Sequence, residues 1–145
     1  MICTFFGHSD CFDLDEQKLQ RAIEKLILDG VDTFYVGNQG CFDRIVFECL
    51  LQLQKIYQHI RVSVVLAYLP TKQSEYDPYS NYSIYPEGIE IGPPRFAIDR
   101  RNKWLINQSN YCLCHIDRTW GGAYKFARQA KRRGLTVINL GGVEL

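Results

Sequence analysis

The fold is decided by residues 2–36, which read ICTFFGHSDCFDLDEQKLQRAIEKLILDGVDTFYV. The apolar run at the start of this stretch predicts a buried strand, and the polar residues after it predict a loop. Asp13 and Glu16 have the spacing of a capping box and predict the start of a helix. Gly30 suits the end of that helix, and residues 33–36 predict a second strand. The stretch is therefore one strand–helix–strand unit, which is typical of a parallel sheet.

The same alternation continues towards the C-terminus. Further strands are predicted at residues 62–66, 111–116 and 135–140, with helices that include residues 42–53, 97–108 and 123–130. Neither a linker nor an internal repeat interrupts the pattern. We therefore expect a single domain over residues 1–145, of the α/β class. Its core would be a Rossmann-like open, mostly parallel sheet of about five strands, with helices on both faces.

One long stretch, residues 67–96, breaks the alternation. It is rich in tyrosine and contains Tyr68, Tyr76, Tyr79, Tyr82 and Tyr85. A small hairpin is predicted to turn at residues 86–88. Loops of this length inside a compact domain are usually functional or mobile. The tyrosines either stack on a ligand's base or form a small core of their own.

Composition and charge narrow the function classes. The chain has 145 residues, of which 46% are hydrophobic and 23% are charged, so it is globular and not disordered. Its net charge of +1 disfavours a protein that works mainly by gripping a nucleic-acid backbone. Neither a signal peptide nor a membrane-spanning apolar run is recognisable, which predicts a cytoplasmic protein with no membrane partner.

The six cysteines are expected to be reduced thiols, in keeping with a cytoplasmic location. Cys112 and Cys114 are two residues apart in a predicted strand, and so share one face as small buried residues. No cysteine pair has the spacing of a zinc site, so neither a metal nor a cofactor is expected.

Loops that follow strands carry the candidate binding residues. In parallel α/β sheets, ligands bind beyond the carboxyl ends of the strands, near the point where the strand order reverses. Two of these loops are glycine turns that lead into helices, where backbone N–H groups attract anions. Turn chemistry alone also explains such glycines. The candidate residues in the loops are Gly7, His8 and Ser9, then Gly37, Asn38, Gln39, Gly40 and Cys41, and finally Asp117, Gly121, Gly122 and Ala123.

The helix at residues 97–108 gives a separate indication. Ile98 and Leu105 lie on one face, and Arg101 and Asn102 fall on the same stripe. A charged side chain on an inward stripe needs a partner. Arg101 either binds a phosphate or carboxylate or forms an internal salt bridge, for example to Asp43 or Asp117.

Three residues are candidates for acid–base chemistry. His8 is a possible acid–base group in the first loop, although a lone loop histidine is often only polar surface. Asp43, in the first turn of its helix, either stabilises the helix dipole or holds a ribose hydroxyl. Asp117 follows a strand and is the third candidate.

Three stretches of the sequence are similar to motifs of a known family and occur in the same order. They are Phe5-Phe6-Gly7-His8-Ser9, Gly37-Asn38-Gln39-Gly40-Cys41-Phe42-Asp43, and Arg100-Arg101-Asn102-Lys103-Trp104-Leu105-Ile106 followed by Ser109 and Gly121-Gly122. Over nearly its whole length the chain resembles the SLOG superfamily. This Rossmann-like group is related to the lonely-guy phosphoribohydrolases and to the DNA-processing protein A. The resemblance is greatest to short bacterial and phage members.

This resemblance implies binding of nucleotides or ADP-ribose-like molecules at the strand ends. Some relatives sense nucleotide second messengers in antiphage defence, and others cleave the N-glycosidic bond of a nucleoside monophosphate. The catalytic motif of the phosphoribohydrolases is not kept, because Lys125 stands at its threonine position and Arg128 at its glutamate position. An arginine cannot act as the carboxylate which that reaction needs.

The leading hypothesis is thus a protein that binds a nucleotide-type small molecule as a sensor or to sequester it. The alternative is a hydrolase of a nucleoside phosphate, with Asp43 or Asp117 as the acid and His8 assisting; Glu48 is a further substitute carboxylate. A single-stranded DNA partner is a third hypothesis, which the near-neutral charge disfavours. A homo-oligomer is compatible with the sequence.

Overall fold

A computed structural model describes residues 1–11, 13–69 and 81–145. It contains one six-stranded sheet in which every neighbouring pair of strands is parallel, in the order β4-β3-β2-β1-β5-β6. This confirms the predicted α/β class and the Rossmann-like arrangement, with one strand more than expected. The strands are β1 (Ile2–Gly7), β2 (Thr33–Val36), β3 (Arg61–Val65), β4 (Ser83–Ile84), β5 (Tyr111–His115) and β6 (Thr136–Asn139).

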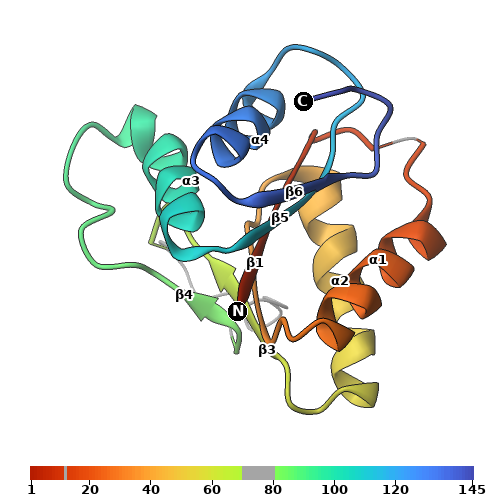
Figure 1. The fold of residues 1–145 in the computed structure, drawn as a ribbon. Coiled ribbons are helices and arrows are strands. Elements are labelled where there is room, and N and C mark those ends of the chain that lie inside the picture. The colour runs from red at the N-terminus through yellow and green to blue at the C-terminus, as the bar shows by residue number, and fades with distance from the viewer. Residues whose placement is uncertain (12, 70–80) are drawn as a thin grey trace.

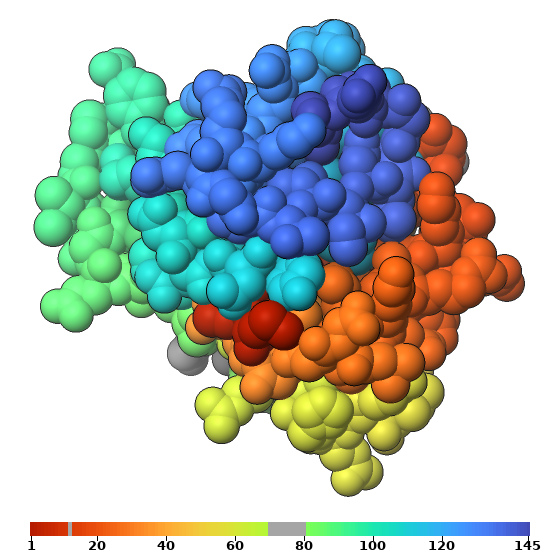
Figure 2. Space-filling view, in the orientation of Figure 1, coloured from red at the N-terminus to blue at the C-terminus, as the bar shows by residue number. Residues whose placement is uncertain are grey.

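Helices cover both faces of the sheet, as Figure 1 shows. The helices α1 and α2 lie on one face, and α3 and α4 lie on the other. In the space-filling view, α3, α4 and the C-terminal residues, cyan to blue, cover the upper part of the visible face (Figure 2). The bounds are α1 (Glu16–Leu28), α2 (Gly40–Ile56), α3 (Ala97–Gln108) and α4 (Gly122–Arg132), with a 3-10 turn at Pro94–Phe96 before α3.

Two adjacent phenylalanines of β1 show how the sheet builds two cores. Phe5 stacks near Phe34 and belongs to the core under α1 and α2. Phe6 stacks near Phe126 and belongs to the core under α3 and α4. Successive side chains of a strand point to opposite faces, so a central strand needs apolar residues on both faces to fill both layers. This explains why the opening run of the sequence does not alternate between apolar and polar residues.

The start of α1 differs from the prediction. The N-cap is Asp15 and not Asp13, because the Asp15 carboxylate accepts hydrogen bonds from the backbone N–H groups of Gln17 and Lys18, each at 3.1 Å. Aspartate is a favoured N-cap residue, so residue type does not choose between Asp13 and Asp15. The choice depends on where the chain leaves the preceding loop. The predicted capping box of Asp13 with Glu16 is therefore not formed, and that prediction is wrong.

The predicted hairpin at residues 86–88 is also wrong. Residues 83–84 form the short strand β4, which pairs with β3 in parallel and adds the sixth strand. A turn does follow, since the N–H of Ile89 donates to the carbonyl of Pro86 at 3.3 Å, but no returning strand is built on it. Of the tyrosines predicted to contact a ligand, Tyr76 and Tyr79 lie outside the described residues.

The cysteines correct a further expectation. Cys11 and Cys41 form a disulfide, with their Cα atoms 6.0 Å apart, so the six cysteines are not all free thiols. The fold brings these residues together by laying the loop after β1 on the start of α2, where the N–H of Cys41 donates to the carbonyl of Ser9 at 3.0 Å. Cys112 and Cys114 are buried on β5, as predicted. Within the described residues, no helix is long and apolar enough to cross a bilayer.

Candidate functional site

A cleft of about 300 Å³ opens at the carboxyl edge of the sheet. The chain places β2, β3 and β4 on one side of β1 and then returns to place β5 on the other, so the strand order reverses between β1 and β5. The cleft lies at this reversal, which is where ligands bind in open α/β sheets. Described residues that line it are Phe5, Phe6, Gly7, His8, Ser9, Asp10, Gly37, Gln39, Asp43, Ile98, Arg101, Asn102, Leu105, Arg118, Trp120, Gly121, Gly122 and Ala123.

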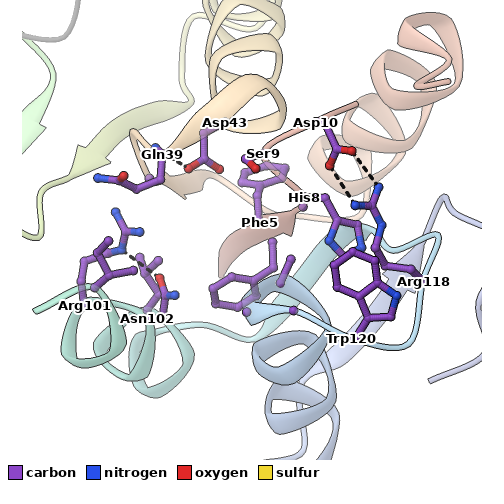
Figure 3. Close-up of a pocket in the computed structure, with 18 residues that line it drawn as sticks. Phe5, His8, Ser9, Asp10, Gln39, Asp43, Arg101, Asn102, Arg118 and Trp120 are labelled. Atoms are coloured by element: carbon purple, nitrogen blue, oxygen red, sulfur yellow. Dashed lines mark hydrogen bonds and ion pairs between the residues drawn. The ribbon is translucent and has the colours of Figure 1, made fainter. Parts of the chain in front are cut away.

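Figure 3 shows two polar groups on opposite sides of the cleft, with Phe5 between them. Arg101, Asn102, Gln39 and Asp43 form one group, and His8, Asp10, Arg118 and Trp120 form the other. The first group comes from α3 and the start of α2, and the second from the loops after β1 and β5. An apolar floor between polar walls is typical of small-molecule sites.

Arg101 is almost completely buried, with 3% of its surface exposed. Its Nη1 donates to the carbonyl of Val65 at 3.0 Å, and its Nε donates to Oδ1 of Asn102 at 2.9 Å. Among the described residues, Nη2 has no hydrogen-bond acceptor. The predicted inward stripe is therefore confirmed. Burial of a guanidinium with one side unused is unusual unless that side meets an anion.

Gly37 makes room for Arg101 and Asp43 to approach each other. A Cβ atom at this position would lie 2.8 Å from Nη1 of Arg101 and 2.8 Å from Oδ2 of Asp43. Of the two internal partners predicted for Arg101, Asp43 is thus its neighbour. Asp117 pairs instead with Arg118, whose Nε lies 2.8 Å from Oδ1 of Asp117.

Asp43 has a structural role at the start of α2. Its Oδ2 accepts a hydrogen bond from the backbone N–H of Gln39 at 2.9 Å, and only 7% of the residue is exposed. Burial raises the pKa of Asp43 to about 6, although the Gln39 N–H and the charge of Arg101 act in the opposite direction. Asp43 is therefore a carboxyl group in the cleft that exchanges its proton close to neutral pH.

This raised pKa predicts a pH-dependent stability difference between the wild type and Asp43→Asn. The folded state holds the Asp43 proton more tightly than the unfolded chain, whose pKa is near 3.8. The stabilisation is complete below that value and is lost as the pH rises through about 6. At pH 7 we expect the asparagine variant to be more stable by about 3 kcal/mol, and this gap to close near pH 4.

Urea unfolding of both proteins from pH 4 to pH 8 measures the gap. Asp29→Asn is the control, because Asp29 is exposed at the C-terminal end of α1 and its variant should follow the wild type at every pH. A gap between wild type and Asp43→Asn that stays constant with pH would contradict the raised pKa.

The N-terminus of α4 opens into the cleft. Gly121 is its N-cap and has φ 95°, a conformation that favours glycine, and no side chain caps the helix. Backbone N–H groups in the first turn of a helix have no partner within the helix, and the helix dipole places positive charge there. Gly122 and Ala123 line the cleft, so this turn presents unpaired donors to a ligand.

The start of α2, the other predicted anion site, is partly used by the protein itself. The N–H of Gln39 bonds to Asp43, and the N–H of Cys41 bonds to Ser9. Gly40 has φ 91°, and a Cβ there would lie 2.7 Å from Cα of Ser9, so its glycine serves close packing of two loops. Gly40 and Cys41 do not line the cleft, and neither does Asn38.

Asp10, Arg118 and Trp120 lie in the loops expected at the site, but no binding role was predicted for them. Nη1 of Arg118 lies 3.0 Å from Oδ1 of Asp10, and its Nε contacts Asp117, so one guanidinium ties together the loops after β1 and β5. This pairing lowers the pKa of Asp10 and Asp117. The Arg118 guanidinium also lies over the ring of Trp120, which is 66% exposed at the cleft. The Asp-Arg-Thr-Trp run after β5 is the sequence signal for Arg118 and Trp120, and Asp10 has no comparable signal.

His8 lies in the cleft wall and not on the surface, with 8% of the residue exposed. Its Nε2 lies 3.5 Å from Oδ1 of Asp117, while Asp117 itself does not line the cleft. Arg128, at the position of the catalytic glutamate in the resembled enzymes, is exposed on α4 and bonds to the hydroxyl of Tyr124 at 3.2 Å. Among the described residues that line the cleft, the buried ionisable groups besides Arg101 are therefore the carboxyl group of Asp43 and the imidazole of His8.

No protein-family model matches the chain, and no curated protein matches it at a significant level. The function must therefore be argued from the cleft itself.

Proposed function

We propose that this protein binds a small molecule that carries a phosphate group, of the nucleotide or ADP-ribose type, in the cleft between β1 and β5. One observation carries the proposal: the uncapped first turn of α4 faces a cleft whose other wall holds the buried guanidinium of Arg101. Both are donors for an anion, and within the part of the chain that the structure describes neither has an acceptor that uses it fully. The likeness of the sequence motifs to the SLOG superfamily supports the same ligand class.

Each wall of the cleft would hold a different part of the ligand. The backbone of Gly121, Gly122 and Ala123 would hold a phosphate, and Arg101 with Asn102 would hold a second phosphate or a ribose. The exposed ring of Trp120, steadied by Arg118, is a surface on which a base would stack. Trp120 is a second candidate for this contact besides the tyrosines of residues 67–96, of which Tyr68 donates its hydroxyl to the carbonyl of Pro94 at 3.2 Å.

Hydrolysis of such a ligand is a second candidate function, favoured by one observation. Asp43 is a buried carboxyl group in the cleft with a pKa of about 6, which suits a general acid or base near neutral pH. Its oxygen is engaged by Gln39, and the resembled catalytic glutamate is absent, so binding without turnover is the simpler function.

A panel of ligands tests the proposal. Thermal unfolding would be followed with AMP, ATP, ADP-ribose, NAD, cyclic ADP-ribose isomers and cyclic dinucleotides. A ligand at about one hundred times its Kd adds roughly 2.7 kcal/mol of stability, which gives a clear shift in Tm. Analysis of the same samples for released base or ribose phosphate separates a binder from a hydrolase. A panel without any shift would contradict the proposed ligand class.

Arg101→Met should weaken binding of a ligand found in this way by at least about tenfold, because a charged hydrogen bond contributes about 1.5–3 kcal/mol. Methionine keeps most of the apolar stem in the buried site. Since it leaves Asp43 without a neighbouring positive charge, the double variant Asp43→Asn with Arg101→Met guards against a loss caused by unfolding. Titration calorimetry gives the affinities.

Arg100→Met is the matched control for this substitution. Arg100 is the neighbouring residue on α3, but its guanidinium bonds to the carbonyls of Ile89 and Pro93, and it does not line the cleft. We expect its variant to bind as the wild type does. Equal losses in the Arg100 and Arg101 variants would contradict the assignment of Arg101.

A further inference from the structure

Behind the loops of the cleft lies a cluster of metal-ligating side chains that the proposed function does not use. Asp13, His115 and Asp117 place one ligand atom each within 4.8 Å of one another. Nε2 of His115 lies 3.9 Å from Oδ1 of Asp13. These residues come from the loop before α1, the end of β5 and the loop after it, so the fold and not local sequence spacing brings them together.

A fourth side chain, that of His8, lies beside this cluster next to Asp117. Nε2 of His8 is buried and has no hydrogen-bond partner among the described residues. It lies 3.5 Å from Oδ1 of Asp117, and the His8 side chain is 7% exposed. A buried imidazole nitrogen without a partner is costly, because buried polar groups are nearly always satisfied. A cation at this place would satisfy it.

Charge gives a further reason for a cation. Asp13 and Asp117 belong to the cluster, and Asp10 is joined to it through Arg118, which pairs with Asp10 and Asp117 at the same time. Among the described residues, Arg118 is the only lysine or arginine within ion-pair distance of these three carboxylates. Three carboxylates against one guanidinium leave an excess of about two negative charges, which a divalent ion would neutralise.

We propose that Asp13, His115, Asp117 and His8 bind a divalent transition-metal ion. Two imidazoles and two carboxylates form a mixed nitrogen and oxygen set, which suits Zn²⁺, Co²⁺, Fe²⁺ or Mn²⁺ better than Mg²⁺ or Ca²⁺. Ligands about 2.1 Å from one ion lie no more than about 4.2 Å apart, so the cluster must contract slightly. Asp13 can supply that movement, since 69% of its side chain is exposed.

The ion would couple this cluster to the cleft without depending on the nucleotide proposal. Nδ1 of His8 faces the turn at Gly121, since a Cβ built there would lie 3.9 Å from this nitrogen. The two ring nitrogens of His8 thus face the cluster and the cleft. Metal bound at Nε2 would fix the orientation of the ring and its tautomer.

Titration with cobalt(II) chloride tests the proposal, using the full chain without a histidine tag. We expect saturable binding of one equivalent, with d–d absorption of a nitrogen- and oxygen-ligated ion and no thiolate-to-metal charge-transfer band. Asp13→Asn and His8→Gln should each weaken binding at least about tenfold, and His8→Gln should also change the d–d spectrum. Asp13 is exposed, so its variant should keep the fold, which circular dichroism checks.

Matched controls come from the same chain. Asp29→Asn removes an exposed carboxylate at the far end of α1, and His59→Ala removes the one histidine outside the cluster. Both should bind Co²⁺ as the wild type does. The proposal is overturned by an absence of saturable binding, by a thiolate band, by unchanged binding in Asp13→Asn or His8→Gln, or by an equal loss in either control.

Discussion

Gly122→Glu should abolish ligand binding while making the protein more stable. A Cβ at Gly122 would meet nothing within 4 Å, and its φ is not positive, so a side chain fits there. The new carboxylate lies at the N-terminus of α4, where it adds about 0.3–1 kcal/mol through the helix dipole. The carboxylate would also fill the position proposed for a phosphate, and its negative charge would repel the phosphate. We expect affinity to fall by at least about a hundredfold, since a like charge costs several kcal/mol there.

Gly122→Gln is the matched control, because glutamine has the same size without the charge. It should retain much more affinity than the glutamate variant. Titration calorimetry and urea unfolding on the three proteins give both quantities. If Gly122→Glu binds as the wild type does, the first turn of α4 does not hold the anion.

Gly7→Ala should cost about 3 kcal/mol of stability, at the upper end of the usual range for overpacking a core. The new Cβ would lie 2.2 Å from Cγ and Cδ1 of Phe42 and 2.8 Å from its Cβ. Phe42 is completely buried in the first turn of α2, so its ring has no open space to move into. The glycine at the end of β1 is thus what lets α2 pack against the loop that lines the cleft.

A double-mutant cycle separates this clash from other effects. With Phe42→Ala the ring is absent, and adding Gly7→Ala should then cost much less than it does in the wild type. Gly142→Ala is the control, since a Cβ there would meet nothing within 4 Å. A Gly7→Ala variant within about 0.5 kcal/mol of the wild type would show that the packing at this point is looser than described.

Periodicity was sufficient to predict the sheet and its helices, because both faces of each central strand must be apolar. Phe5 and Phe6 illustrate this, since each fills a different core. Periodicity was not sufficient for β4, because a strand of two residues has no repeating pattern and its pairing with β3 depends on the path of the chain. The choice between Asp13 and Asp15 as the cap of α1 likewise depends on tertiary structure.

The candidate site was predicted in part for the same reason. Arg101 was identified because a charge on an inward helical stripe conflicts with the hydrophobic pattern. No role was predicted for Arg118 and Trp120 within their loop, because loop residues have no such periodicity and only the fold shows that Arg118 joins two loops. The disulfide between Cys11 and Cys41 was missed because the redox state of the cysteines was inferred from the expected cytoplasmic location. The contact between the loop after β1 and the start of α2 is what brings the two cysteines together.

The most direct test of the central claim is an amide NMR titration of the ¹⁵N-labelled protein with AMP. The account predicts saturable shifts at Gly121, Gly122 and Ala123 and at the side-chain Nε–H of Arg101, with α1 unaffected. Shifts confined to surfaces away from the cleft, or no shift at any concentration that the panel finds stabilising, would contradict it.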